Sequence, residues 1–180
     1  EDGIRDYDVT GVQTCALPIF SLSLEHRGPD DEGVEVVPVD ESQDCYLGLV
    51  HRRLSIIDLT SAAHQPMYDP QTGNWIVFNG EIYNYCEIRE VLAGDGHSFQ
   101  SNSDTEVILK AYAHWGVSCL SKLRGMFALA LWHAKEKRLF LAVDRIGIKP
   151  LYFCKIGRGP FLFSSEIRAL LSTGIIQKEI

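Results

Sequence analysis

The stretch Phe78-Asn79-Gly80-Glu81 combines groups that could stabilise a developing negative charge. Asn79 offers a carboxamide N–H, and Gly80 offers a backbone N–H that no side chain shields. Two such donors side by side can bind the oxyanion that forms when a nucleophile attacks a carbonyl group. The plainer interpretation is a turn without chemistry, because Asn-Gly is also the dipeptide most tolerant of positive φ. These residues alone favour the plainer interpretation.

Arg53 and Asp104 are candidates for binding opposite charges. Adjacent arginines such as Arg52 and Arg53 are normally solvated, but apolar residues follow Arg53 and could draw it inward. A buried guanidinium pairs with a carboxylate through two parallel hydrogen bonds. Asp104 would lie in the first turn of a predicted helix, where the helix dipole already explains a carboxylate.

Local patterns predict the elements that would position these groups. The apolar run at 75–78 predicts a buried strand, and Asn84 with Glu87 has the spacing of a capping box for a helix over about 84–93. Ser103 and Glu106 have the same spacing before a second helix that ends at Gly116.

Most of the remaining strands are expected to form hairpins. Short apolar runs separated by turn residues predict strands at 34–39, 45–50, 126–132, 139–143, 151–154 and 161–163. Long strand–helix–strand units are scarce. The sheets should therefore be mainly antiparallel with helices on their outer faces, which is an α+β fold.

The composition excludes several classes of protein. A chain of 180 residues with 46% hydrophobic and 23% charged residues suits a globular domain. A net charge of −7 does not favour binding to nucleic acid, and no apolar run is long enough to span a membrane. The five cysteines are widely spaced without a Cys-x-x-Cys pair, which argues against a metal site and for reduced thiols in the cytoplasm.

Residues 1–19 stand apart from the rest of the chain. They show no clear helical or strand period and resemble a translated sequencing adaptor joined to a truncated reading frame. A flexible natural leader is the alternative. Because they carry no periodic apolar face that could offset the entropy of ordering, we expect them not to pack on the domain, which would cover residues 20–180.

Five motifs occur in one order along the chain: His26-Arg27-Gly28-Pro29-Asp30, Arg53-Leu54-Ser55-Ile56-Ile57-Asp58, Phe78-Asn79-Gly80-Glu81-Ile82-Tyr83-Asn84, Ser103-Asp104 and Asp144-Arg145-Ile146-Gly147-Ile148-Lys149-Pro150-Leu151-Tyr152. Together they resemble the class II glutamine amidotransferase domain of glutamine-hydrolysing asparagine synthetases. The resemblance implies a four-layer αββα sandwich of the N-terminal-nucleophile hydrolase type.

The resemblance also implies roles for individual residues. Asn79 and Gly80 would donate to the oxyanion, Arg53 would bind the α-carboxylate of glutamine, and Glu81 and Asp104 would receive its α-ammonium group. The full substrate-binding set would be Arg53, Leu54, Ile56, Ile57, Asn79, Gly80, Glu81 and Asp104.

The beginning of the chain departs from the family pattern. The family starts with Met-Cys-Gly, whose cysteine is the nucleophile, and a strand and a helix follow before the first motif. Here Cys15 is not N-terminal and precedes His26 by only 11 residues (26 − 15). We therefore assign no nucleophile, expect this first strand and helix to be missing, and expect the chain as printed to be inactive as a glutaminase.

Two classes of function remain open. In the first, the chain is the glutaminase part of an asparagine synthetase, or of a relative with another acceptor, and supplies ammonia to a synthetase domain that lies outside this chain and would use ATP and Mg²⁺. In the second, it is a non-catalytic module that binds glutamine or a partner. A homodimer is compatible with either. The residue that follows the initiator Met at the true 5′ end of the gene would separate them.

Overall fold

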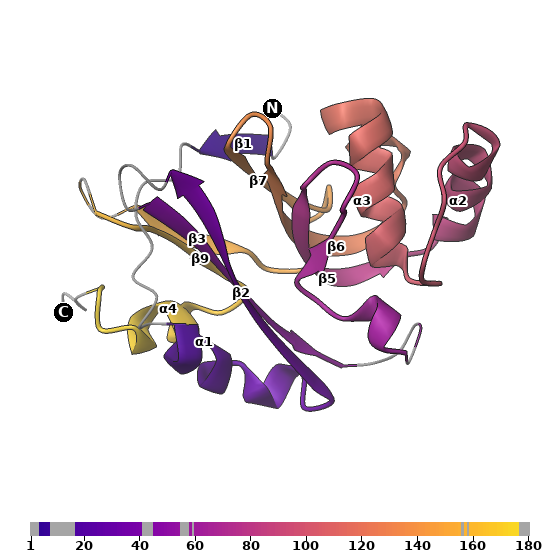
Figure 1. Cartoon of the computed structure of the whole chain (residues 1–180). Helices are drawn as coiled ribbons and strands as arrows, with labels where there is room; N and C mark the ends of the chain where they lie inside the picture. Colours follow the sequence, from indigo (N-terminus) through magenta and orange to yellow (C-terminus); the bar gives the residue numbers. More distant parts are fainter. Residues whose placement is uncertain are drawn as a thin grey trace.

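The structure is a computed structural model that describes residues 4–7, 17–40, 45–54, 58, 60–155, 157 and 159–176. Its elements form four layers in the order helix, sheet, sheet, helix, as the family resemblance implied (Figure 1). Helices α2 and α3 form one outer layer, and α1 and α4 form the other.

The larger inner layer is a five-stranded antiparallel sheet with the order β1-β7-β6-β5-β4. Its strands are β1 (Ile4–Tyr7), β4 (Met67–Tyr68), β5 (Trp75–Ile82), β6 (Gly125–His133) and β7 (Arg138–Val143). The continuous apolar run in β6 is buried along most of its length. This pattern is typical of a central strand that is covered on both faces.

The second inner layer consists of two hairpins. β2 (Asp31–Asp40) pairs with β3 (Cys45–Arg53), and β8 (Tyr152–Lys155) pairs with β9 (Phe161–Ser164), both antiparallel. Alternate residues of β3 are buried, which orients one face of this hairpin toward the five-stranded sheet.

The helices cover the outer faces of the two inner layers. They are α1 (Leu17–Ser23), α2 (Tyr85–Gly94), α3 (Asp104–Trp115) and α4 (Ile167–Ser172), with short 3₁₀ turns at η2 (Glu25–Arg27), η4 (Ser61–Ala63) and η5 (Gly116–Lys122). None of the described helices is long and apolar enough to cross a membrane.

Apolar clusters fill the spaces between the layers. Ile108 of α3 packs with Leu131 of β6 in the first cluster, and Leu49 of β3 packs with Trp132 of β6 in the second. A third cluster joins α1 and α4 to β9. Each layer therefore buries one face against the next, and this burial is the main stabilising contribution.

Of the two predicted capping boxes, one is confirmed in part. The Ser103 hydroxyl accepts a hydrogen bond from the Glu106 N–H at 3.2 Å. The prediction for Asn84 is wrong, because its carboxamide bridges the Lys122 carbonyl and the Arg124 N–H instead. Its ψ of 26° lies outside the extended range of an N-cap residue, so the side chain does not turn back to the helix.

The expectation that residues 1–19 do not pack on the domain differs from the structure at two places. Strand β1 pairs with the outer edge of β7, whose backbone groups accept any extended segment regardless of its side chains. Helix α1 begins at Leu17, which is only 7% exposed and has the helical spacing of Phe20 and Leu24. A helix therefore precedes the first motif, and the boundary at residue 20 cuts through it.

A buried ion pair connects α3 to the loop before β5. Lys110 Nζ lies 2.8 Å from Asp69 Oδ1, and the side chains are 7% and 1% exposed. Burial opposes ionisation of Asp69, but hydrogen bonds from Lys110, Thr72 and the Gln71 backbone outweigh it and keep the pKa of this carboxyl below its usual value. The pair thus fixes the loop that leads into β5.

Replacing Lys110 with Met should lower the free energy of unfolding by about 3–5 kcal/mol, because it leaves Asp69 as a buried charge without a counter-ion. Urea unfolding followed by circular dichroism measures this loss. Lys135→Met is the matched control, since Lys135 is exposed and its loss should cost less than about 0.5 kcal/mol. An equal midpoint for the two variants would contradict the prediction.

Candidate functional site

A cavity of about 310 Å³ lies where the ends of β3 and β5 meet the first turn of α3. It is lined by every described residue of the predicted substrate-binding set, namely Arg53, Leu54, Asn79, Gly80, Glu81 and Asp104. Ile56 and Ile57 lie outside the described residues. All five motifs contribute residues to the lining, although they are far apart in the sequence.

The edge of β5 that borders the cavity has a regular hydrogen-bond pattern. The Phe78 N–H donates to Gln65 Oε1 at 2.7 Å, and the Ile82 N–H donates to Asp104 Oδ2 at 3.0 Å. Both N–H groups therefore point away from β6. Because alternate residues of a strand direct their N–H groups to the same side, the Gly80 N–H also points to this edge. This orientation supports the predicted role of Gly80 as a donor.

Gly80 also has a steric reason to be glycine. A Cβ at this position would lie 2.2 Å from the Met126 carbonyl oxygen of β6, so no side chain fits without moving a strand. Asn79 has the same alternation as Val77, which packs toward the second layer. The Asn79 side chain therefore points toward the second layer, whereas the Gly80 N–H points to the edge of β5. Both residues line the cavity.

Arg53 is turned inward, one of the two alternatives that the sequence left open. The residue is 8% exposed and shares the inward alternation of Leu47 and Leu49. Its Nη2 donates to the Asp58 carbonyl and its Nη1 to the Thr60 carbonyl. Both contacts are to backbone carbonyl oxygens of the following loop, and they orient the guanidinium.

Asp104 is more than a favourable charge at a helix N-terminus. It is 5% exposed, and burial raises the pKa of its carboxyl, with a small further contribution from nearby Glu81. The raised pKa means that the ionised carboxylate is short of compensating charge. A cation bound in the cavity would supply that charge.

His51 and Gln65 line the cavity but were not predicted from the sequence. His51 Nε2 donates to the Phe78 carbonyl at 3.0 Å, and burial lowers the pKa of the imidazole to about 4. The alternation of buried residues in β3 could have indicated that His51 points inward, whereas no local sequence pattern marks Gln65. Within the described part of the chain, His51 Nδ1 is buried without a hydrogen-bond partner.

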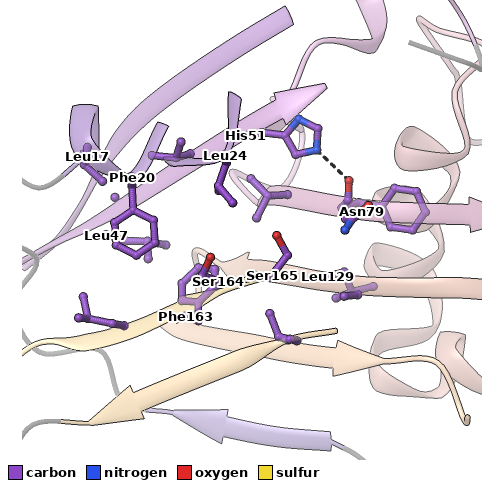
Figure 2. A pocket seen from close by; sticks show the side chains of 18 of the residues that line it. Leu17, Phe20, Leu24, Leu47, His51, Asn79, Leu129, Phe163, Ser164 and Ser165 are labelled. Atoms are coloured by element: carbon purple, nitrogen blue, oxygen red, sulfur yellow. Dashed lines mark hydrogen bonds between the residues drawn. The ribbon is translucent and has the colours of Figure 1, made fainter. Parts of the chain in front are cut away.

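A second, apolar cavity of about 120 Å³ adjoins the first between the two inner layers. Figure 2 shows His51 and Asn79 at one end of it and Leu17, Phe20 and Leu47 at the other. His51 and Asn79 line both cavities, so they mark the boundary between an apolar space and a polar one.

The first motif is built against the end of β3. A Cβ on Gly28 would lie 2.4 Å from the carbonyl carbon of Arg52, so only glycine permits this close approach. The Asp30 N–H then donates to the Arg53 carbonyl at 3.1 Å. The motif therefore fixes the backbone of Arg53 and is not just a turn.

The fifth motif is organised around Asp144, which is 5% exposed. Burial opposes its ionisation, but N–H donors from Ile148, Lys149, Phe127 and Ile146 outweigh burial and lower the pKa of the carboxyl. The loop that they form places Lys149 at the cavity. Among the described residues, no group of three or more His, Cys, Asp and Glu side chains suits a metal ion.

Comparisons with known proteins agree with this arrangement. Residues 7–180 match the glutamine amidotransferase domain family. The chain is 44% identical over 162 residues to asparagine synthetase [glutamine-hydrolyzing] 1 of Bacillus subtilis, covering 90% of this chain and 24% of that protein. It is 41% identical over 152 residues to amidase chry2 of Gibberella zeae, covering 84% of this chain and 22% of that protein. The chain thus spans about a quarter of the length of these relatives.

The fold is similar to that of a solved glutamine phosphoribosylpyrophosphate amidotransferase from B. subtilis. The TM-score is 0.73 at 20% sequence identity, and the alignment covers 95% of this chain and 43% of that chain. The similarity confirms the predicted sandwich of antiparallel sheets between helices.

The low pKa of His51 predicts a pH dependence of stability. Between pH 6.5 and about 4 the unfolded state binds a proton that the folded state excludes. Neutral His51 therefore makes its full contribution to the free energy of unfolding above pH 6.5, and this contribution is lost as the pH falls toward 4. His51→Gln retains an N–H donor for Phe78 but does not titrate, so its free energy of unfolding should fall about 2 kcal/mol less between pH 7 and pH 5 than that of the unmodified chain.

Urea unfolding at both pH values measures this difference. The same loss of stability in His51→Gln and the unmodified chain would show that His51 is protonated in the folded state.

Proposed function

Since the chain belongs to the glutamine amidotransferase domain family, we propose that its cavity binds L-glutamine and presents the side-chain amide to a nucleophile. One observation carries the proposal: a single cavity joins a buried cation, a buried carboxylate and an outward-pointing backbone N–H. A zwitterionic amino acid with a carbonyl group on its side chain complements all three.

The charged groups would bind the two α-substituents of glutamine. Arg53 carries five N–H donors, so its bonds to loop carbonyls are compatible with a bound α-carboxylate. Asp104 and Glu81 would receive the α-ammonium group, which offsets the cost of burying the Asp104 carboxylate. The side chain of the bound glutamine would then extend toward Asn79 and Gly80.

The chemistry would be nucleophilic acyl transfer. A thiolate attacks the side-chain carbonyl carbon, and the resulting oxyanion accepts hydrogen bonds from the Asn79 carboxamide and the Gly80 N–H. The amide nitrogen takes a proton from a general acid beside the nucleophile and leaves as ammonia. Water then hydrolyses the thioester to glutamate and releases the thiolate. No residue of this chain is assigned as the nucleophile.

In the whole protein, we propose that the ammonia reaches a synthetase domain outside this chain. That domain would use ATP and Mg²⁺ to amidate aspartate in the cytoplasm. A different acceptor is the second candidate, because one similar fungal protein is named an amidase and not an asparagine synthetase. Both candidates share the glutaminase step described above.

The chain as printed should bind L-glutamine without releasing ammonia. Isothermal titration calorimetry measures the binding, and a coupled glutamate dehydrogenase assay measures the ammonia. Arg53→Ala should weaken binding by roughly 10- to 100-fold, because a hydrogen bond to a charged group contributes about 1.5–3 kcal/mol. Arg124→Ala, an exposed arginine outside the cavity, is the control.

Unchanged affinity in a folded Arg53→Ala variant would exclude Arg53 from glutamine binding. Turnover by the chain as printed that is abolished by Cys15→Ala would identify a nucleophile that we have not assigned.

Arg53 and Asn79 should differ in kinetics when the chain carries the Met-Cys-Gly start of the family. Arg53 contacts a carboxylate that does not change during the reaction, so Arg53→Ala should mainly raise KM. Asn79 faces charge that develops only in the transition state, so Asn79→Ala should lower kcat by about 10²–10³. Asn79→Asp is the companion variant, and near-normal kcat in folded Asn79→Ala would place the oxyanion site elsewhere.

A further inference from the structure

Strand β5 loses its neighbour just before the candidate site. β4 pairs only with Trp75 and Ile76. From Phe78 to Ile82, no described strand lies on that side of β5. At a free edge of this kind the strand can twist, and its N–H and C=O groups can bind water. The proposed donors of the site nevertheless lie on this part of the strand.

Two side chains make the hydrogen bonds that a neighbouring strand would make. Gln65 Oε1 accepts from the Phe78 N–H at 2.7 Å, and His51 Nε2 donates to the Phe78 carbonyl at 3.0 Å. Phe78 is thus bound as a residue in an antiparallel ladder is bound, by one acceptor and one donor. The two side chains come from different elements, a loop and strand β3.

Both side chains are themselves anchored. Gln65 is 5% exposed, and its Nε2 donates to Thr105 Oγ1 at 3.2 Å in the first turn of α3. His51 is part of the continuous pairing of β3 with β2, opposite Gly33. The Phe78 peptide is therefore held from the helix layer on one side and from the second sheet on the other.

This arrangement helps to fix the direction of the Gly80 N–H. Two residues beyond Gly80, the Ile82 N–H is held by Asp104 at 3.0 Å. Gly80 lies midway between two fixed points of the same edge, while its neighbours Asn79 and Glu81 are paired with β6, so contacts on both sides of the strand limit rotation of its N–H. A donor that is already oriented stabilises developing charge without reorganisation at the moment of reaction.

We propose that Gln65 and His51 are positioning residues, which hold the edge of β5 so that the Gly80 N–H and Asn79 are aimed at the side-chain oxygen of bound glutamine. The ligand in this statement rests on the proposed function, whereas the holding of Phe78 does not. His51 acts through its Nε2–H, which the neutral imidazole retains, so the role needs no change of charge.

The test uses the chain with two variants that remove the contacts, Gln65→Met and His51→Phe. His51→Gln keeps an N–H donor of similar reach, and Gln71→Met is a control for loss of an exposed glutamine side chain, in the loop between β4 and β5. The probes are L-glutamine and L-norvaline. They share both α-substituents, but only glutamine has a side-chain carbonyl for Gly80 and Asn79 to contact.

The expected result is a loss of preference and not a general loss of binding. The ratio of the norvaline Kd to the glutamine Kd should fall about 3- to 10-fold in Gln65→Met and His51→Phe, which is the effect of about one neutral hydrogen bond. His51→Gln and Gln71→Met should keep the ratio of the unmodified chain. Hydrogen exchange of the Phe78 amide, read by NMR, should accelerate at least about tenfold in Gln65→Met.

Other outcomes would overturn the inference. If both variants fold and keep the glutamine preference, or if the affinities for both ligands fall equally, Gln65 and His51 have only a structural role. If the Phe78 amide exchanges as slowly in Gln65→Met as in the unmodified chain, Gln65 does not hold the edge. If the unmodified chain shows no preference for glutamine, the proposed function fails, and the exchange of the Phe78 amide alone then decides whether the edge is held.

Discussion

The site depends on where the backbone hydrogen bonds of β5 go. One set of alternate residues pairs with β6, and the other set faces the side on which β4 has ended. Buried backbone groups must find partners. Here Gln65, His51 and Asp104 supply partners for Phe78 and Ile82. Gly80, between them, contributes its N–H to the wall of the cavity, so the same edge belongs to the sheet and to the site.

The same principle applies to the charged residues of the cavity. Arg53 donates to loop carbonyls, and Asp104 accepts from the backbone of β5. Backbone partners of this kind orient a guanidinium or a carboxylate but do not cancel its charge. The two residues lie in different layers and bring opposite charges to one cavity, which a free amino acid would complement. This is the physical basis on which we assign the cavity to glutamine.

Much of the fold is a local property of the sequence. Apolar runs interrupted by short turns predicted antiparallel hairpins and an α+β class, because a period of two and turn chemistry act over a few residues, whereas the four-layer sandwich was implied by the family resemblance. The Ser103 cap was predicted from its spacing to Glu106, whereas the inward position of Arg53 was one of two alternatives that the flanking residues left open. The motifs also indicated which residues would gather, and all of those that the structure describes line one cavity. Their roles in binding and catalysis stay predictions.

Other features were decided only by the tertiary structure. Residues 1–19 have no apolar period of their own, but β7 offers an edge with which Ile4–Tyr7 pairs. Asn84 has the sequence spacing of a cap, yet it binds backbone groups about 40 residues away. Nothing near Gln65 indicates that it completes the ladder of β5. The sequence determines which segments can form strands and helices, whereas partners contributed by another layer exist only once the layers have packed, since a hydrogen bond requires its two groups to meet in space.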